Sequence, residues 1–355
     1  MRLRDLGLAV GTRPTGEANA VTDVPGVRVG HAEAPAAGGR TGLTVLVPFA
    51  GRPRPVLTGC YAVDGGAAMT GLNVAEDFGT AAGPIALAPA AAAGAAYEAL
   101  IEYGLEVDPG LPADAGWPPL VIAVDDSAVN DPAAAHRALQ PADLHRALAG
   151  AAPSRPVEGA VGIGAGLAAF GCRGGVGTAS RRVAADGGAG YLVGALVAAN
   201  GGEPGRLALN GCPVGPLLDL APLPLTAPRT FAALVVTDAP LAPRQLDRLA
   251  GRAALGLVRV GLLDEHTREG LVLAQSTDAL TAPRAGSALQ AVAMLGESGM
   301  PALFAAAAEA CEEAVWNALV AATGAAPTRL RHGAALPLLP LRGWPAKVGR
   351  PAAGG

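Results

Sequence analysis

The chain has 355 residues, of which 51% are hydrophobic and only 3% are aromatic. A chain of this length can bury a sizeable core, which has to be built from Ala, Val and Leu packed closely among 50 glycines. The formal net charge of −4 offers no basic surface for nucleic acid or for an anionic membrane, so neither is expected as a partner.

The cysteines and the apolar segments bound the class of protein further. Four cysteines are widely spaced without any C-x-x-C pair, so reduced thiols are expected and a zinc site is not. No feature of the sequence calls for another metal or an organic cofactor. The chain lacks an apolar signal core at its start and any segment suited to a membrane helix, which predicts a cytoplasmic protein.

The first third of the chain predicts several strands and one long helix. Residues 19–31 alternate in part around a Pro-Gly turn, which is typical of a turn that leads into an edge strand. Residues 42–49 form an apolar run suited to a buried strand, and a glycine-rich segment follows at 59–71. An Ala-rich helix is predicted over 83–103, and a short apolar strand over 119–124.

Two carboxylates, Asp125 and Asp126, follow directly after the strand predicted at 119–124. Carboxylates at a strand end can bind a metal or act as acid and base. The Asn-Asp-Pro sequence at 130–132 favours the simpler interpretation, in which they cap a turn. Both residues nevertheless stay candidates for substrate binding.

A second glycine-rich segment spans 159–182. Its G-x-G-x-G core at 162–166 lacks the spacing of a dinucleotide fingerprint, and no Walker lysine is present. The glycines therefore indicate close approach of backbone to backbone or to substrate. The apolar run at 191–199 predicts a buried strand that ends at Asn200, whose amide can either point into a cleft or form a turn.

A Pro- and Leu-rich loop at 213–228 leads into the apolar run 230–237, which predicts a buried strand opened by Thr230. A hydroxyl where an accessible loop enters a rigid strand is well placed for a nucleophile. Threonine is also common at strand starts for purely structural reasons, so the local pattern leaves both interpretations open.

The last third of the chain predicts two helices around a strand. Amphipathic helices are expected over 243–260 and 301–323, with a polar loop at 264–269 and a strand at 271–274 between them. The segment 336–355 is rich in Pro and Gly and is expected to be a tail. The irregular alternation of strands and helices favours packed layers over a doubly wound sheet.

The order of these motifs resembles the N-terminal-nucleophile hydrolases that include L-aminopeptidase/D-amidase/D-esterase, β-peptidyl aminopeptidase and nylon-oligomer hydrolase. The matching segments are spread over nearly the whole chain, at 69–71, 161–166, 174–181, 213–215, 237–240, 252–257 and 312–319. The resemblance implies the α+β class, as a four-layer αββα sandwich of the kind found in ornithine acetyltransferase, with one domain over 1–335. It also implies self-cleavage into 1–229 and 230–355, and a homo-oligomer, a tetramer of αβ units.

The same resemblance implies roles for single residues. The family's nucleophile lies seven residues before the Thr of its Thr-Asp-Ala-Pro motif, which here is Thr237, so Thr230 is the implied nucleophile. Asn200 matches the family's oxyanion-hole Asn. Arg173 stands where many members have Lys, and it can supply fixed positive charge but not a base. Glu269 is the carboxylate nearest to the family's acidic motif, offset by one residue.

The substrate pocket departs from the family's pattern. The family's Asn-Gly-Asn-Gly-Glu-Met-Thr-Gly corresponds here to 64–71, which keeps Asp64 and Met69 as candidates for substrate binding but loses a carboxylate at Ala68. At the implied cleavage site, Arg229 stands where members have Gly or Asn. These changes predict a less polar pocket around a retained hydroxyl.

The resemblance therefore implies a self-processing amidohydrolase or aminopeptidase that cleaves small peptides, amides or esters through a Thr acyl-enzyme, without metal or cofactor. Two alternatives stay open from the sequence, besides a dinucleotide enzyme, which the glycine spacing at 162–166 makes the least favoured. One is a catalytically degenerate scaffold or binding protein, which the pocket losses favour. The other is an acyltransferase of the ornithine acetyltransferase type, which would transfer the acyl group to an amino acid instead of to water.

Overall fold

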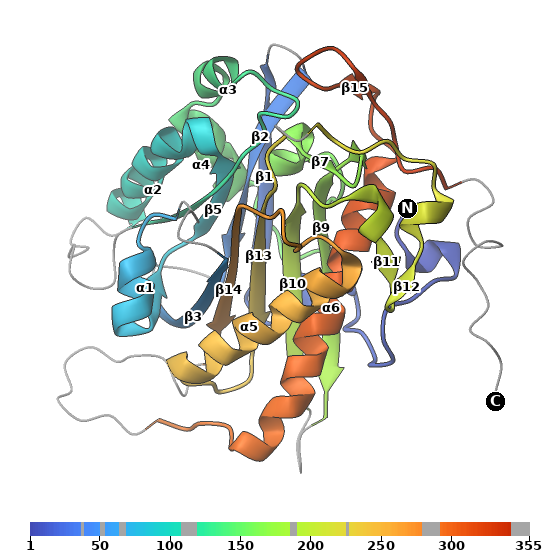
Figure 1. Cartoon of the computed structure of the whole chain (residues 1–355). Coiled ribbons are helices and arrows are strands. Elements are labelled where there is room, and N and C mark those ends of the chain that lie inside the picture. The colour runs from blue at the N-terminus through green and yellow to red at the C-terminus, as the bar shows by residue number, and fades with distance from the viewer. Residues whose placement is uncertain are drawn as a thin grey trace, which may run out of the picture.

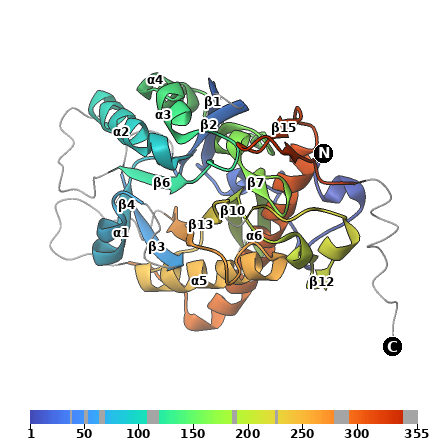
Figure 2. The same ribbon diagram turned by 45° about the horizontal axis from the view of Figure 1, so that its top comes forward.

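Two β-sheets lie face to face in the middle of the molecule, and helices cover the outer face of each sheet (Figure 1). Figure 2 shows the same layers from a tilted direction, with one group of helices on either side of the sheets. The computed structural model of the protein describes residues 1–36, 39–49, 54–63, 69–107, 119–184, 190–224, 227–278 and 292–341.

The smaller sheet consists, in spatial order, of β1 (Arg28–Ala36), β2 (Gly39–Val47), β5 (Ile85–Pro89) and β6 (Leu120–Val124). Its strands are antiparallel except for β5 and β6, which are parallel and therefore need a long connection between them. The helices on this side are α2 (Ala93–Val107), α3 (Pro132–Ala138) and α4 (Pro141–Ala149). Helices α2 and α4 bury Leu100 and Leu144 against the outer face of the sheet.

The larger sheet consists, in spatial order, of β4 (Thr80–Ala82), β3 (Pro55–Val63), β14 (Glu269–Ser276), β13 (Thr230–Thr237), β10 (Tyr191–Ala199) and β9 (Gly175–Val183). Only β13 and β14 are parallel. Its outer face is covered by α5 (Pro243–Val260) and α6 (Met300–Ala322).

The remaining elements are short. They are the helix α1 (Leu72–Phe78), the strands β7 (Ala168–Ala169), β8 (Cys172–Arg173), β11 (Ala208–Leu209), β12 (Cys212–Pro213), β15 (Thr328–Arg329) and β16 (Ala335–Leu336), and the 3₁₀ turns Arg4–Leu6, Val21–Asp23, Ala90–Ala92, Gly162–Gly166, Pro204–Arg206, Gly215–Leu217 and Glu297–Gly299. No helix in the described ranges is long and apolar enough to cross a membrane.

Strand β13 shows why the central strands are continuous apolar runs. Ala232 and Leu234 face the core between the two sheets, whereas Ala233 and Val235 face α5 and α6. A strand that is buried on both faces has no polar alternation. With apolar cores between the sheets and under both helical layers, the chain has the four layers αββα, which confirms the predicted fold class.

One predicted element is wrong. The Ala-rich segment 83–103, expected as a single helix, contains strand β5 (Ile85–Pro89) before α2 begins at Ala93. All five residues of β5 are buried, because it lies inside the smaller sheet and under the helices. Short apolar runs of this kind carry no period that separates strand from helix.

The start of the segment expected as a tail packs against the domain. Leu336 and Leu339 are each 3% exposed, and the carbonyl of Pro337 accepts a hydrogen bond of 2.9 Å from the backbone N–H of Arg173. Residues 342–355 lie outside the described ranges.

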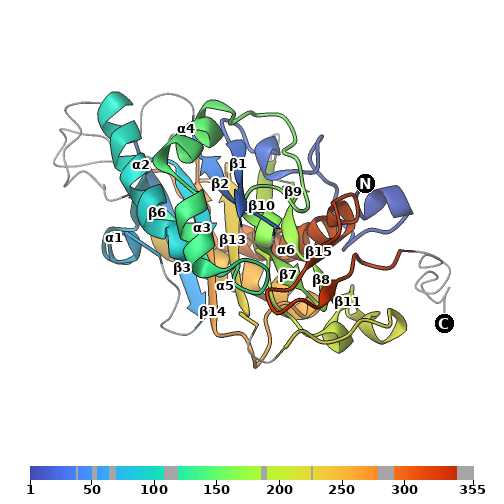
Figure 3. The ribbon, with the colours of Figure 1, turned by 90° about the horizontal axis from the view of Figure 1, so that it is seen from above.

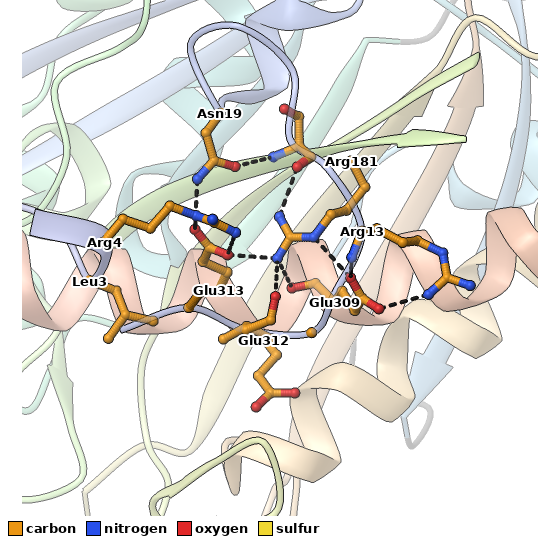
Figure 4. A network of polar contacts seen from close by, with 12 residues as sticks. Leu3, Arg4, Arg13, Asn19, Arg181, Glu309, Glu312 and Glu313 are labelled. Carbon is orange, nitrogen blue, oxygen red and sulfur yellow. Dashed lines mark hydrogen bonds and ion pairs between the residues drawn. The ribbon is translucent and has the colours of Figure 1, made fainter. Parts of the chain in front are cut away.

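A buried ion network ties the N-terminal segment to α6. Arg181 of β9 is fully buried and donates to Glu309 at 3.0 Å and to Glu313 at 2.6 Å (Figure 4). Arg4 and Arg13 bind the same two carboxylates from the N-terminal segment, each at 2.7 Å. Figure 3 shows that segment, in blue, beside the orange-red α6. Burial acts to raise the pKa of Glu313, but the hydrogen bond from Arg4 and the charge of Arg181 hold it below its usual value.

Candidate functional site

The hydroxyl of Thr230 lies where three strands end or begin. Strand β10 is antiparallel to β13, so Asn200, which follows β10, lies beside the start of β13. Asp125 follows β6 of the opposite sheet. Thr230 Oγ1 accepts hydrogen bonds from Asn200 Nδ2 at 3.0 Å and from the backbone N–H of Asp125 at 3.1 Å. Two donors from different sheets therefore converge on this one oxygen. Thr230 as a whole residue is 5% exposed.

The amide of Asn200 is held in one orientation. Its Oδ1 accepts from the backbone N–H of Ala168 at 3.2 Å, and its Nδ2 also donates to the carbonyl of Asp125 at 2.8 Å. Because an amide oxygen can only accept and the nitrogen can only donate, these partners fix which end faces Thr230. The side chain is 1% exposed, so water does not compete for it.

Gly201 allows the backbone before Thr230 to approach closely. It has a φ of +100°, and a Cβ placed on it would lie 2.9 Å from the Cα of Arg229. Both the left-handed backbone and the contact exclude other residues at this position. The sequence indicated such a role for glycines in general, and here it applies directly beside the candidate nucleophile.

Arg229, the residue before Thr230, is 5% exposed. Its carbonyl accepts a hydrogen bond of 3.1 Å from the backbone N–H of Arg268, and its Nη2 forms an ion pair with Glu203. Within the described ranges, Arg229 is not among the non-glycine residues with positive φ. The continuous chain therefore does not place Arg229 in the left-handed region that favours glycine.

Glu269 begins β14 directly beside Thr230. The parallel register of β13 and β14 pairs these two residues, and the next pair inward on the same face is Ala232 with Leu271. Ala232 and Leu271 both face the core between the sheets, so by the alternation of strands Thr230 and Glu269 are on that face too. Adjacent strands lie about 4.8 Å apart, so Glu269 and Thr230 are direct neighbours across the sheet.

Arg173 is connected to Thr230 indirectly, through Ala168 and Asn200. It pairs in the β7–β8 hairpin with Ala168, the residue whose N–H holds Asn200. Its Nη2 donates to the carbonyl of Ala165 at 2.9 Å, and its Nε has no hydrogen-bond partner in the described part of the chain. Burial lowers the pKa of Arg173, although its guanidinium stays charged at neutral pH.

Asp126 is a buried structural carboxylate. It is 3% exposed, and its Oδ2 accepts from Thr41 Oγ1 at 2.8 Å and from Asn130 Nδ2 at 2.7 Å. Burial raises its pKa, and both hydrogen bonds act in the opposite direction. These contacts give Asp126 the role of closing the turn after β6, which was the simpler interpretation of the sequence.

Asp125 contributes to the site through its backbone. Its carboxylate accepts from the N–H of Ser127 at 2.8 Å, whereas its own N–H and carbonyl contact Thr230 and Asn200. Local sequence pointed to the carboxylate and gave no signal for the backbone groups, because their position depends on how the two sheets pack.

The other two candidates for substrate binding are Met69 and Asp64, of which the structure describes only Met69. Met69 forms an isolated bridge with Ile122 of β6 and packs against the core between the sheets. Asp64 lies outside the described residues. In the described ranges, no group of three or more His, Cys, Asp or Glu side chains is arranged to hold a metal ion.

One cavity in the described part of the chain has a volume of about 220 Å³. It contacts the segment after Asp125 and the segment before Arg229. Its lining residues are Ser127, Ala128, Pro224, Ala227, Leu330, Arg331 and His332.

Comparison with known sequences gives consistent matches. The model of peptidase family S58 matches residues 19–331. Beta-peptidyl aminopeptidase BapA of Sphingosinicella microcystinivorans is 35% identical over 359 residues, which cover 90% of this chain and 86% of that protein. BapA of Sphingosinicella xenopeptidilytica is 32% identical over 344 residues, with 90% and 85% covered.

Solved structures agree with the sequence comparison. A beta-aminopeptidase from Burkholderia sp. superimposes with a TM-score of 0.87 at 39% identity, over 99% of this chain and 100% of that one. The L-aminopeptidase D-Ala-esterase/amidase of Ochrobactrum anthropi, described as a variant of the Ntn hydrolase fold, does so with a TM-score of 0.87 at 32% identity, over 98% and 99%. The resemblance inferred from the sequence is thereby confirmed. The chain belongs to peptidase family S58 and is a hydrolase that acts on peptide or amide bonds.

Proposed function

We propose that the protein is a self-processing aminopeptidase that cleaves small peptides, amides or esters through an acyl-enzyme on Thr230. The observation that carries this proposal is the hydroxyl of Thr230, which has Asn200 Nδ2 at 3.0 Å and the N–H of Asp125 at 3.1 Å. Acyl transfer requires a nucleophile and, beside it, fixed donors that can stabilise the oxyanion formed on the attacked carbonyl, and Asn200 and the Asp125 N–H lie close enough to Thr230 for that role.

The first reaction is cleavage of the chain itself. Thr230 Oγ1 attacks the carbonyl carbon of Arg229, the hydroxyl proton passes to the leaving nitrogen of Thr230, and an ester replaces the amide. Water then hydrolyses this ester, which leaves a carboxylate on Arg229 and a free α-amine on Thr230. The hydrogen bond from Arg268 N–H to the Arg229 carbonyl supports the proposal, because it holds the bond to be cut in one orientation.

The second reaction is hydrolysis of a substrate. A free α-amine has an unperturbed pKa of about 8, so at neutral or slightly alkaline pH it can take the proton of its own hydroxyl. The oxygen attacks the substrate carbonyl, and Asn200 Nδ2 and the Asp125 N–H stabilise the negative charge that develops there. Water releases the acyl group and restores Thr230.

The names of the relatives suggest which substrates to try first. Purified protein is expected to release p-nitroaniline from the p-nitroanilides of β-alanine, L-alanine or another small amino acid. Absence of release from a panel of α- and β-aminoacyl anilides, together with absence of ester hydrolysis, would refute the proposed activity. We also propose that the two pieces of one cleaved chain form an αβ unit and that four such units form a tetramer, which light scattering of the purified protein tests.

Asn200→Ala is expected to lower kcat by about 100- to 1,000-fold, because removal of one oxyanion donor has this effect in acyl-transfer enzymes. The measurement is steady-state hydrolysis of the best anilide by protein whose cleavage is checked on a denaturing gel. Asn210→Gly is the matched control, since Asn210 also makes two side-chain hydrogen bonds but has an exposed position and a φ of +51° that glycine accepts. An Asn200→Ala enzyme with the kcat of this control would show that the oxyanion is stabilised elsewhere.

Glu269→Gln is expected to lower kcat by about 100-fold, the lower end of what a positioned acid or base contributes. The reason is its place beside Thr230 in the register of β13 and β14. Glu265→Gln serves as the control, because Glu265 lies in the preceding loop and pairs with Arg206 at the surface. If both variants turn over as the wild type does, Glu269 takes no part in the reaction.

A further inference from the structure

The side chain of Arg229 occupies a defined place beside the candidate nucleophile. It is nearly fully buried, and its Nη2 pairs with Glu203, which follows Asn200 by three residues and whose side chain is 23% exposed. Its Nη1 is buried and has no hydrogen-bond partner in the described part of the chain. Burying a guanidinium with an unsatisfied nitrogen costs folding free energy. The burial of the Arg229 side chain is therefore not explained by the stability of the loop alone.

Gly201 lies within contact distance of the side-chain stem of Arg229. A Cβ on Gly201 would lie 3.2 Å from the Cβ and 3.5 Å from the Cγ of Arg229, so the stem of the arginine lies directly over the glycine. The segment from Asn200 to Glu203 thus contributes a donor for the reacting carbonyl, a flat floor for a side-chain stem and a carboxylate at its far end. We call the space above Gly201 that ends at Glu203 the acyl side-chain pocket.

Self-cleavage gives this pocket a chemical meaning. In the ester formed on the chain, the carbonyl carbon of Arg229 is bonded to Thr230 Oγ1. A substrate acyl-enzyme has the same bond between its acyl residue and the same oxygen. Arg229 is therefore the first acyl residue that the nucleophile takes, and its side chain marks where the side chain of a later acyl residue can lie.

We propose that Glu203 binds the cationic side chain of the substrate's acyl residue, so that the enzyme prefers amides of arginine or lysine. This inference rests on the proposed function, because it takes the acyl residue from the attack of Thr230 on Arg229. Once the bond is cut, the chain end at Arg229 is free to leave, and Glu203 loses its partner. A mostly buried carboxylate without a cation then favours a substrate that supplies one.

The surrounding charges leave Glu203 available. The nearby Arg206 pairs with Glu265 through side chains that are about half exposed, and not with Glu203. The cation also has to sit at the end of a long side chain, because the pocket is filled in this structure by the full length of an arginine. The inference is thus specific for arginine and lysine and excludes short acyl residues as the preferred ones.

The first experiment compares kcat/KM for the p-nitroanilides of L-arginine, L-citrulline and L-leucine. Citrulline has the shape of arginine without the charge. We expect arginine to exceed citrulline by about 10- to 100-fold in the wild type, as a charge-assisted hydrogen bond predicts, and the ratio to fall to about one in Glu203→Gln. The leucine anilide should change by less than about threefold, and Glu265→Gln should keep the wild-type ratio. A wild type that hydrolyses leucine but treats arginine and citrulline alike would refute the pocket and leave the proposed function intact.

The second experiment does not depend on catalysis or on self-cleavage. Arg229→Gly removes the guanidinium from the acyl side-chain pocket in either form of the chain. Calorimetry is expected to show that this variant binds L-arginine at least about tenfold more tightly than L-citrulline, and that Arg229→Gly combined with Glu203→Gln loses the difference. Equal binding of the two amino acids overturns the inference. Selective binding by a protein that hydrolyses no amide would retain the pocket and refute the proposed reaction.

Discussion

Thr230→Ala is expected to leave the chain uncut and to reduce amide hydrolysis by at least about 10,000-fold, to the level left by binding and oxyanion donors alone. The substitution removes the oxygen on which Asn200 and Asp125 converge. It also prevents release of the α-amine that would serve as the base, so both reactions fail for the same reason. Thr230→Ser keeps an attacking oxygen in the same place and should retain part of the cleavage.

The measurement combines a denaturing gel with kcat/KM for the best anilide. Thr277→Ala is a suitable control, because Thr277 follows the far end of β14, away from this site, and the substitution removes a hydroxyl that donates a long hydrogen bond of 3.4 Å to the carbonyl of Thr237 while the backbone N–H bond to the same carbonyl stays. It should cut itself and turn over as the wild type does. Hydrolysis by Thr230→Ala at the rate of Thr277→Ala would place the nucleophile elsewhere in the chain.

Arg181→Met is expected to lower the free energy of unfolding by about 3–5 kcal/mol, the usual cost of removing one partner from a buried ion network. Arg181 is fully buried, and its loss leaves the buried carboxylates of Glu309 and Glu313 with fewer cations. Arg4 and Arg13 still bind the two carboxylates, but their own side chains are 38% and 32% exposed and neutralise them less completely.

Denaturant unfolding followed by circular dichroism measures this loss. Arg244→Met is the control, because Arg244 pairs with Asp247 at the surface with 87% of its side chain exposed, and a pair of this kind contributes less than about 1 kcal/mol. An Arg181→Met protein as stable as Arg244→Met would mean that the two glutamates are neutral or solvated in the folded state.

The ion network around Arg181 also joins the two pieces that the proposed cleavage would produce. Arg4, Arg13 and Arg181 belong to the piece 1–229, whereas Glu309 and Glu313 belong to the piece 230–355. The four cysteines are free thiols, so no disulfide links the two pieces. We therefore expect cut chains to stay associated through the central sheet and this network, and to separate only under denaturing conditions.

Much of the fold could be predicted from the sequence. The strands at 191–199 and 230–237 and the helix at 243–260 coincide with β10, β13 and α5, because long apolar or amphipathic runs are bounded there by Gly, Asn or Pro. Strand β5 could not be predicted, since Ile85–Pro89 has no alternation and continues into an Ala-rich segment. Where both faces are buried, the period that distinguishes the elements is lost.

The site could be predicted only in part. Thr230 and Asn200 are 30 residues apart in the chain and meet because β10 and β13 are antiparallel neighbours, which the resemblance implied and the local pattern did not. The ion pair of Glu203 with Arg229 has no local signal at all, because it depends on how two loops pack over Gly201. Glu309 and Glu313 interrupt the apolar pattern of α6, and their burial is explained by Arg181, which lies far away in the sequence.

The intact mass of the purified wild-type protein under denaturing conditions tests the central claim most directly. The account predicts two species, residues 1–229 and 230–355, whose masses add up to the full 34.8 kDa chain plus one water, with Thr230 at the start of the smaller one. A single species of 34.8 kDa that hydrolyses amides at a rate unchanged by Thr230→Ala would contradict it.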